Sequence, residues 1–146
     1  MIEIKKFKKE HCIEISNTEG FSSRYPGVDL AERAMHQAEC GPASTIFLDG
    51  KPCVVGGIVS YWAGCGEGWA FFSPLVFKAT LRVSRALKIE FNRLLKEGCF
   101  HRVQATCSSD NNQYCRFIEF LGFDIQGQLE KYYSDKTDAF LYEMVR

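Results

Sequence analysis

The pattern of hydrophobic and polar residues changes its period several times in the N-terminal part of the chain. Apolar and charged residues alternate over residues 1–7, which predicts a strand, and Cys12 and Ile15 then lie in a helical pattern. Ser, Thr, Gly and Asn dominate residues 17–27, which indicates a loop. Glu32 follows Asp29 at the spacing of a capping box, so we expect a second helix that begins there.

Three strand-like runs follow and predict an antiparallel meander. They cover residues 45–48, 53–62 and 69–73. Asp49 and Gly50 join the first two runs, and this pair of residues favours a tight hairpin turn. Gly64, Gly66 and Gly68 separate the last two runs and predict a second turn.

The second half of the chain alternates between helical and strand patterns. Helical spacing extends from Val83 to Gly98 and again from Tyr114 to Leu121, where Asp110 is the expected N-cap. Strand patterns cover residues 102–107, 123–133 and 139–145. The helix that ends at Gly98 connects two strands, so these two strands should be parallel neighbours in one mixed sheet.

Composition and charge exclude several classes of protein. The chain has 146 residues, of which 46% are hydrophobic and 25% charged, which is typical of one globular domain over residues 1–146. Eighteen basic and eighteen acidic side chains give no net charge, so we expect no nucleic acid partner. No run of about eighteen apolar residues and no apolar signal-like N-terminus is present, which predicts a cytoplasmic protein without a membrane partner.

The cysteines and histidines point to no covalent or metal chemistry. The seven cysteines are odd in number and form no Cys-x-x-Cys pair, which indicates reduced thiols. No spacing of cysteine and histidine matches a zinc site, so no metal is expected. Cys107 ends a predicted strand, but His101 on that strand is about 20 Å away in an extended chain. We therefore do not expect covalent catalysis by Cys107.

Two short features match those of one known family. Ser73 and Pro74 follow the third strand of the meander, and Asn111 precedes a helix that ends in a Leu-Gly-Phe sequence at residues 121–123. Together with the order of elements, these features make the whole chain resemble the GNAT family of acyl-CoA-dependent N-acetyltransferases. The resemblance implies an α/β (α+β) fold, with a mixed, mostly antiparallel sheet of about seven strands flanked by about four helices.

The resemblance also implies what the protein binds and does. Members of the family move an acetyl group from acetyl-CoA to a primary amine of a small molecule or protein by direct attack, and they are often homodimers. The small size and the altered cofactor loop are similar to GNAT-like proteins of phages and prophages. The alternative is therefore a non-catalytic, phage-related binding or structural protein that has lost the usual cofactor loop.

The cofactor site follows from the same resemblance. In the family the fourth and fifth strands part, and the pantetheine arm pairs with them like an added strand. Here we expect the strands to part after Ser73 and Cys107, with the phosphates at the start of the next helix. The implied cofactor-binding residues are Phe72, Ser73, Leu75, Lys78, Thr80, Arg82, Val83, Ser84 and Asn111.

The phosphate loop departs from the family pattern. Leu81 and Val83 stand where the family has glycine or another small residue, and glycine lets the backbone approach a phosphate closely. Lys78, Arg82 and Arg85 offer compensation by direct charge pairing. The alternative is that these basic residues are ordinary solvated side chains at a helix start.

The family's catalytic groups correspond to few residues of this chain. Ile118 stands at the position where the family has a tyrosine that acts as a general acid. Tyr114, one helical turn earlier, is therefore the candidate acid. The alternative is that Tyr114 is an aromatic residue of the core. Glu67 is the candidate base, with a chain of water molecules as the alternative. Ser73 is the candidate partner for the acetyl oxygen. The acceptor amine is expected to contact Phe21, Arg24, Tyr25 and Tyr133.

Overall fold

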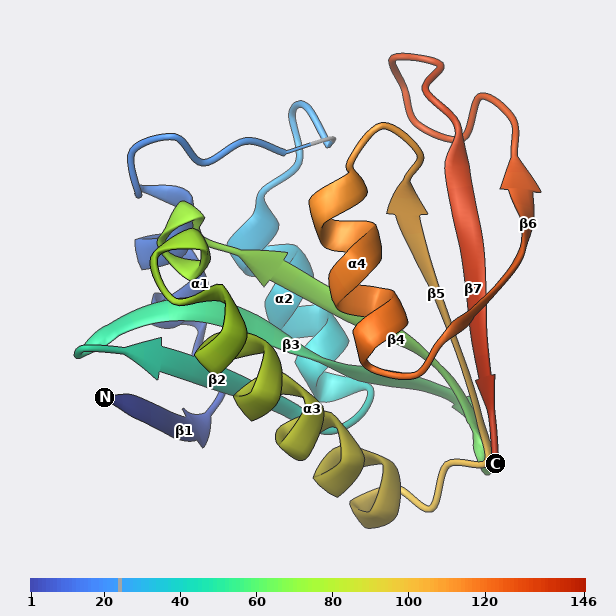
Figure 1. The fold of residues 1–146 in the computed structure, drawn as a ribbon, viewed down its shortest axis with the longest axis horizontal. Helices are drawn as coiled ribbons and strands as arrows, with labels where there is room; N and C mark the ends of the chain where they lie inside the picture. Colours follow the sequence, from blue (N-terminus) through green and yellow to red (C-terminus); the bar gives the residue numbers. More distant parts are fainter. Residues whose placement is uncertain (24) are drawn as a thin grey trace.

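The computed structural model describes residues 1–23 and 25–146, and its centre is one sheet with the strand order β1-β2-β3-β4-β5-β7-β6 (Figure 1). The strands are β1 (Ile2–Lys6), β2 (Ala43–Leu48), β3 (Lys51–Trp62), β4 (Cys65–Phe72), β5 (Arg102–Ser108), β6 (Asp124–Leu129) and β7 (Ala139–Val145). The helices are α1 (Lys9–Ser16), α2 (Leu30–Glu39), α3 (Thr80–Glu97), α4 (Asn112–Phe120) and the short 3-10 helix η1 (Pro74–Lys78).

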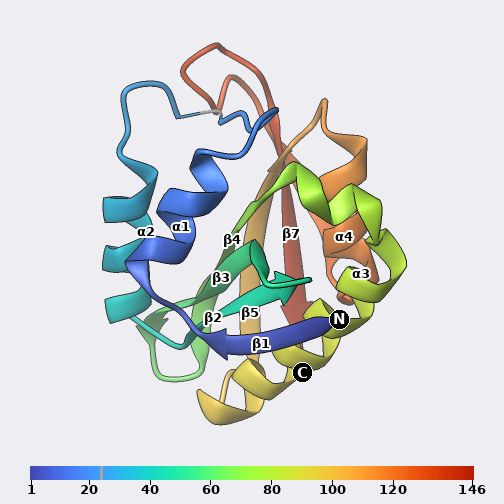
Figure 2. The same ribbon diagram turned by 90° about the vertical axis from the view of Figure 1, so that its left-hand side faces the viewer.

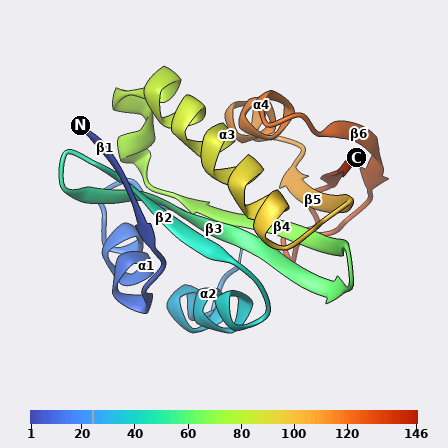
Figure 3. The same ribbon diagram turned by 90° about the horizontal axis from the view of Figure 1, so that it is seen from below.

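Helices cover both faces of the sheet. Figure 3 shows α1 and α2 below the sheet and α3 and α4 above it, and Figure 2 shows the same layers from the side. All neighbouring strands in the described part of the chain are antiparallel except β4 and β5, which α3 connects. The mixed, mostly antiparallel sheet and its one parallel pair are confirmed as predicted from the sequence.

Each face of the sheet packs against its own helices through apolar side chains. Val54 of β3 and Val83 of α3 are buried on one face, whereas Val55 of β3 and Ile15 of α1 are buried on the other. Adjacent residues of a strand point to opposite faces, so β3 contributes to both layers of the core. No helix among the described residues is both long enough and apolar enough to cross a lipid bilayer.

The fourth strand begins earlier than its glycines predict. Gly66 and Gly68 lie inside β4, and only Gly64 lies in the turn before it, with a φ of +83°. A Cβ atom at Gly66 would lie 2.4 Å from the carbonyl oxygen of Val59 on β3. The glycine therefore permits close packing within the sheet, and the prediction that Glu67 lies in a turn is wrong.

Two other boundaries differ from the sequence-based expectation. The helix expected from Val83 begins at Thr80, directly after η1, which the sequence pattern did not indicate. The last hairpin is shorter than expected, because β6 ends at Leu129. Lys131 has a φ of +51°, and its backbone N–H donates to the Asp138 carboxylate at 2.8 Å, so the chain turns there.

The helix caps are confirmed in one case and corrected in the other. Asp29 accepts bonds from the backbone N–H groups of Ala31 and Glu32, at 3.1 and 3.2 Å, and so caps α2 as predicted. The N-cap of α4 is Asn111, whose side chain accepts from the N–H of Tyr114, and not Asp110.

Candidate active site

The parallel strands β4 and β5 stay together only at their beginnings. Residues 65–67 of β4 pair with residues 102–104 of β5, and beyond them the two strands separate (Figure 1). Residues 68–72 still pair with β3 on their other edge, and residues 105–108 still pair with β7. The two facing edges are therefore left without a strand partner among the described residues, and the strands part earlier than at the predicted Ser73 and Cys107.

A cavity of about 750 Å³ occupies this split and reaches both faces of the sheet. Its wall includes residues 67–72 of β4 and residues 105–108 of β5. This volume lies within the range of about 300–1,000 Å³ that is typical of small-molecule sites. The split and the cavity together mark this region as the candidate active site.

Glu67 lies at the point where the two strands separate. It is the last residue of β4 that pairs with β5, and it lines the cavity. The Tyr61 hydroxyl donates a hydrogen bond of 2.6 Å to this carboxylate. Burial, and then the neighbouring Glu67, raises the pKa of Tyr61 to about 12, so the tyrosine remains a neutral donor.

Aromatic side chains surround Glu67 on the face of α1 and α2. Glu67 and Trp69 alternate along β4 and therefore point to the same face. Tyr25, from the loop before α2, and Tyr133, from the loop after β6, approach each other with ring centroids 6.0 Å apart. The Arg33 guanidinium of α2 lies 4.6 Å from the centre of the Tyr25 ring. The predicted acceptor residues Phe21, Tyr25 and Tyr133 thus line one cavity.

A stack of aromatic rings closes the face of α3 and α4. Phe72, at the end of β4, stacks on Tyr114 and Phe117 of α4, with centroid distances of 4.8 and 5.2 Å. Burial raises the pKa of Tyr114, so its hydroxyl stays protonated near neutral pH. Tyr114 lines the cavity and is one of the core aromatics as well.

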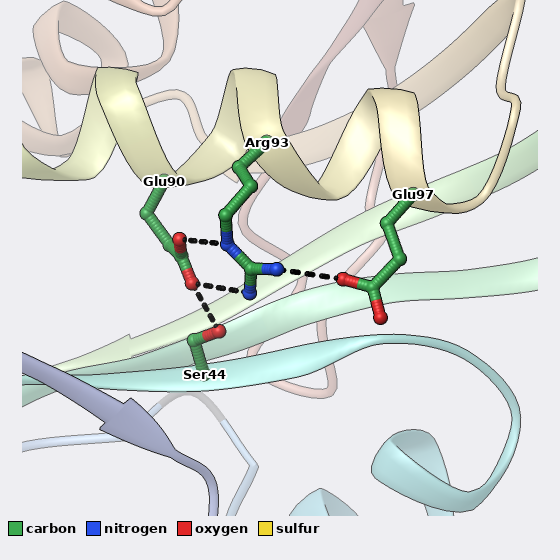
Figure 4. Close-up of polar contacts among 4 residues, drawn as sticks. All are labelled: Ser44, Glu90, Arg93 and Glu97. Atoms are coloured by element: carbon green, nitrogen blue, oxygen red, sulfur yellow. Dashed lines mark hydrogen bonds and ion pairs between the residues drawn. The ribbon is translucent and has the colours of Figure 1, made fainter.

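A second glutamate, Glu90 of α3, also lines the cavity, and Figure 4 shows its polar contacts. Its carboxylate accepts a bond of 2.5 Å from the Ser44 hydroxyl and two bonds from Arg93, which also bonds Glu97. Burial raises the pKa of Glu90, but the bonds from Arg93 and Ser44 outweigh it and leave the pKa below its ordinary value. Glu90 is therefore an ionised, fully bonded group.

Of the predicted cofactor residues at the end of β4 and just after it, Phe72 lines the cavity, whereas Ser73 and Leu75 lie outside its wall. Ser73 is fully buried, and its hydroxyl accepts a bond of 3.1 Å from the N–H of Leu75. The N–H of Ser73 donates to the carbonyl of Cys53 on β3. Ser73 and Leu75 thus bond to each other and hold the first turn of η1.

The predicted phosphate residues lie around the start of α3. Lys78 ends η1, and Arg82 is exposed on the first turns of α3. Thr80 and Ser84 donate their hydroxyl protons to the backbone carbonyls of Val76 and Thr80. The side chain of Val83 points into the core and is fully buried. No side chain caps this helix in the described structure.

Two predicted residues remain to be placed. Asn111 lines the cavity and caps α4, one turn before Tyr114. Arg24 lies outside the described residues. Cys107 also lines the cavity, and its thiol lies 3.4 Å from the thiol of Cys115. Burial raises the pKa of Cys107 further above neutrality, which makes it a poor nucleophile.

The sequence did not indicate Trp69 and Gln37 of the cavity wall, nor Tyr61, which bonds Glu67 from outside that wall. Trp69 stands two residues after Glu67, so a strand period would have placed both on one face. The glycines around Glu67 hide that signal, because their spacing predicts a turn. Gln37 lies one helical turn after Arg33 on α2, but nothing in its sequence context indicates that it faces a cavity.

Comparisons with known proteins find similarity at the level of structure. No protein-family model matches the chain, and no curated protein matches its sequence. The structure of Ard1 from Thermoplasma volcanium is similar with a TM-score of 0.78 and 18% identity, over 99% of this chain and 97% of that one. An acetyltransferase of the GNAT family from Streptococcus pneumoniae has a TM-score of 0.74 and 17% identity, over 99% of both chains.

One similar structure contains a cofactor. It is yncA, a putative acetyltransferase from Salmonella typhimurium with its cofactor acetyl-CoA, at a TM-score of 0.72 and 15% identity, over 99% of this chain and 93% of that one. Similarity over almost the whole of each chain at such low identity identifies the arrangement of the backbone. The protein therefore has the fold of the GNAT acetyltransferases.

Proposed function

We propose that the protein transfers an acetyl group from acetyl-CoA to a primary amine. One observation carries this proposal: β4 and β5 separate after residues 67 and 104 and leave two unpaired strand edges beside a cavity. An extended, amide-containing arm such as pantetheine can hydrogen-bond to such edges as an added strand does. The likeness to a structure that holds acetyl-CoA supports the same ligand here.

The start of α3 suits the phosphates of this cofactor. Its first backbone N–H groups have no side-chain cap, and a helix N-terminus attracts anions. Lys78 and Arg82 are exposed beside these groups and supply positive charge. We therefore assign the pantetheine to the edges of β4 and β5, and the phosphates to residues 78–84.

Glu67 and Tyr114 carry the proton transfers in this proposal. Glu67 accepts a proton from the ammonium group of the acceptor, which frees the amine lone pair to attack the thioester carbonyl. The C–N bond forms, the C–S bond breaks, and the amide nitrogen and the protonated Glu67 each release a proton to solvent. Tyr114, held neutral by burial, donates its proton to the leaving thiolate and recovers one from solvent.

A second candidate is a non-catalytic binding protein with the same fold. The loop before α3 favours it, because Leu81 and Val83 replace small residues and Val83 is fully buried. The Phe72–Tyr114 stack favours it as well, since these rings occupy the face toward η1 and α3. The two candidates differ in whether acetyl-CoA binds.

Thermal unfolding with and without acetyl-CoA separates the two candidates. Acetyl-CoA at a hundred times its Kd should stabilise the folded protein by about 2.7 kcal/mol. Lys78→Ala and Arg82→Ala should each weaken binding several-fold, because each removes a charge beside the phosphates. Arg116→Ala, an exposed arginine of α4 outside the cavity wall, is the matched control and should bind like the wild type.

The result that contradicts the proposal is equally clear. No stabilisation at millimolar acetyl-CoA would contradict the proposed transferase function and favour the non-catalytic binding protein. Stabilisation that Lys78→Ala and Arg82→Ala leave unchanged would keep the cofactor but place its phosphates elsewhere.

A further inference from the structure

Two buried polar atoms in the cavity wall have no hydrogen-bond partner in the described structure. They are Oε1 of Gln37 on α2 and Nε1 of Trp69 on β4. Buried polar groups in folded proteins are nearly always paired, and an unpaired one destabilises the fold. Because both residues line the same cavity, a molecule that enters it is the candidate partner for these atoms.

The packing of Trp69 does not depend on its N–H group. Phe7 and Phe71 contact the Trp69 ring at centroid distances of 6.0 and 5.9 Å, so aromatic contacts hold the indole in place. Gly57 pairs with Trp69 across β3 and β4, and no side chain from that position covers the indole. A phenylalanine at position 69 would keep an aromatic ring at this place and would remove the N–H group together with part of the indole.

The two atoms define the chemistry of a complementary ligand. The indole Nε1 donates a hydrogen bond, and the amide Oε1 accepts one. A carboxamide offers both an acceptor and a donor without carrying a charge. A carboxylate offers no donor to Gln37, and an alkyl group offers neither, so each would leave a buried group unpaired.

We propose that Gln37 and Trp69 select acceptor amines that carry a neutral carboxamide group. This inference rests on the proposed function, because it concerns the amine side of the same cavity. Trp69 lies two residues from Glu67 on the same face of β4, so a ligand bonded to Trp69 keeps its amine close to the proposed base. Sites that hydrogen-bond a substrate group reject analogues that lack it.

Three acceptor amines of matched size test the inference in the acetyl-transfer assay. β-Alaninamide carries a carboxamide, isoamylamine has an isopropyl group of the same shape, and β-alanine has a carboxylate. We expect kcat/KM for β-alaninamide to exceed that for each of the others by about tenfold. Trp69→Phe and Gln37→Met should each remove most of this preference. Trp62→Phe and Gln113→Met, exposed residues outside the cavity wall, should preserve it.

Tryptophan fluorescence provides a readout that does not depend on activity. The chain has two tryptophans, so Trp62→Phe leaves Trp69 as the sole reporter. β-Alaninamide should change the emission of Trp69 in a saturable manner, and at concentrations about tenfold lower than isoamylamine. Gln37→Met in the same background should bring the two apparent Kd values together, even if Trp69→Phe fails to fold.

The outcomes distinguish this inference from the proposed function. Acetyl transfer to all three amines at equal kcat/KM would overturn the inference alone. A preference for β-alanine would also overturn it, because Gln37 would then present its N–H₂ group to the ligand. Absence of transfer, with no stabilisation by acetyl-CoA, would overturn the proposed function, and the fluorescence titration would still decide whether a carboxamide binds. A preference that survives both variants would mean that ordered water satisfies the two atoms.

Discussion

Glu67 and Glu90 line the same cavity from opposite faces of the sheet, and their surroundings differ. Glu90 is only 5% exposed, and Arg93 and Ser44 together donate three hydrogen bonds to it (Figure 4). Glu67 accepts one bond in the described structure, from the neutral hydroxyl of Tyr61. Glu90 is therefore bonded to a cationic guanidinium, whereas Glu67 is bonded to a neutral phenol.

In the proposed reaction, this difference suits the two carboxylates to different tasks. A carboxylate bonded to a guanidinium is held ionised and loses its affinity for protons, so Glu90 is suited to joining α3 to β2. A carboxylate with a neutral partner keeps an unshared lone pair for a substrate proton, so Glu67 is suited to act as a base. Both glutamates line the cavity, so their position alone does not distinguish their roles.

Glu67→Gln should have the largest effect. Removal of a general base typically lowers the rate by about a hundredfold to ten-thousandfold, and the amide keeps the size of the side chain. Steady-state kinetics with acetyl-CoA and β-alaninamide should therefore show a kcat loss in this range. Stabilisation by acetyl-CoA should not change, because Glu67 is assigned to the amine and not to the cofactor.

Glu90→Gln is the comparison for that experiment. At a temperature where it is fully folded, its kcat should stay within about threefold of the wild type, since its partners are structural. A larger loss for Glu90→Gln than for Glu67→Gln would reverse the two assignments. Full activity in Glu67→Gln would mean that water takes the proton.

The sequence predicts the fold well because the fold depends on local periodicity. The alternation over β5 and β7 and the helical stripes of α3 and α4 are properties of neighbouring residues. The parallel pairing of β4 and β5 followed from the helix between them and from the handedness of such connections. Similar rules placed the cap of α2 at Asp29.

The site is predicted less well because it depends on contacts between distant segments. Gly66 is required by the close approach of Val59, which no local pattern reveals, so the sequence around Glu67 predicts a turn where the structure has a strand. Ser73 stands at the family position but bonds to Leu75 within η1. The bond between Tyr61 and Glu67 requires the exact register of β3 on β4.

Glu90→Gln should have the largest effect on stability. The amide keeps the shape of the side chain but weakens its bonds to Arg93 and Ser44, which should lower the free energy of unfolding by about 1–3 kcal/mol. Glu97→Gln removes the exposed end of the same network and should change it by less than about 0.5 kcal/mol. Urea denaturation of the three proteins measures both values, and equal losses would contradict a special role for Glu90.

The stability lost in Glu90→Gln should also depend on pH. The pKa of Glu90 in the folded protein lies below its ordinary value of 4.5, so folding favours the ionised carboxylate. The contribution is therefore fully present above the ordinary value and is lost as the pH falls through the lowered pKa. The difference between wild type and Glu90→Gln should shrink below about pH 4. A difference that grows on acidification would contradict the network.

Tyr61→Phe should have the smallest effect of the series. It removes the one hydroxyl that orients Glu67, so kcat should fall by about threefold to tenfold with little change in KM. Tyr142→Phe is the matched control, because its hydroxyl bonds the carboxylate of Glu119 outside the cavity wall and its loss should leave kcat unchanged.

The decisive measurement is the kcat of the double variant that combines Tyr61→Phe with Glu67→Gln. If Tyr61 acts through the carboxylate, Tyr61→Phe should lower kcat in the wild type and have almost no further effect once Glu67 is glutamine. The effect should also stay constant up to about pH 10, because the pKa of Tyr61 is raised to about 12 and the phenol remains a donor throughout. An equal loss in both backgrounds would instead mean that Tyr61 contacts the substrate directly, and the contrast between the two glutamates would then rest on charge alone.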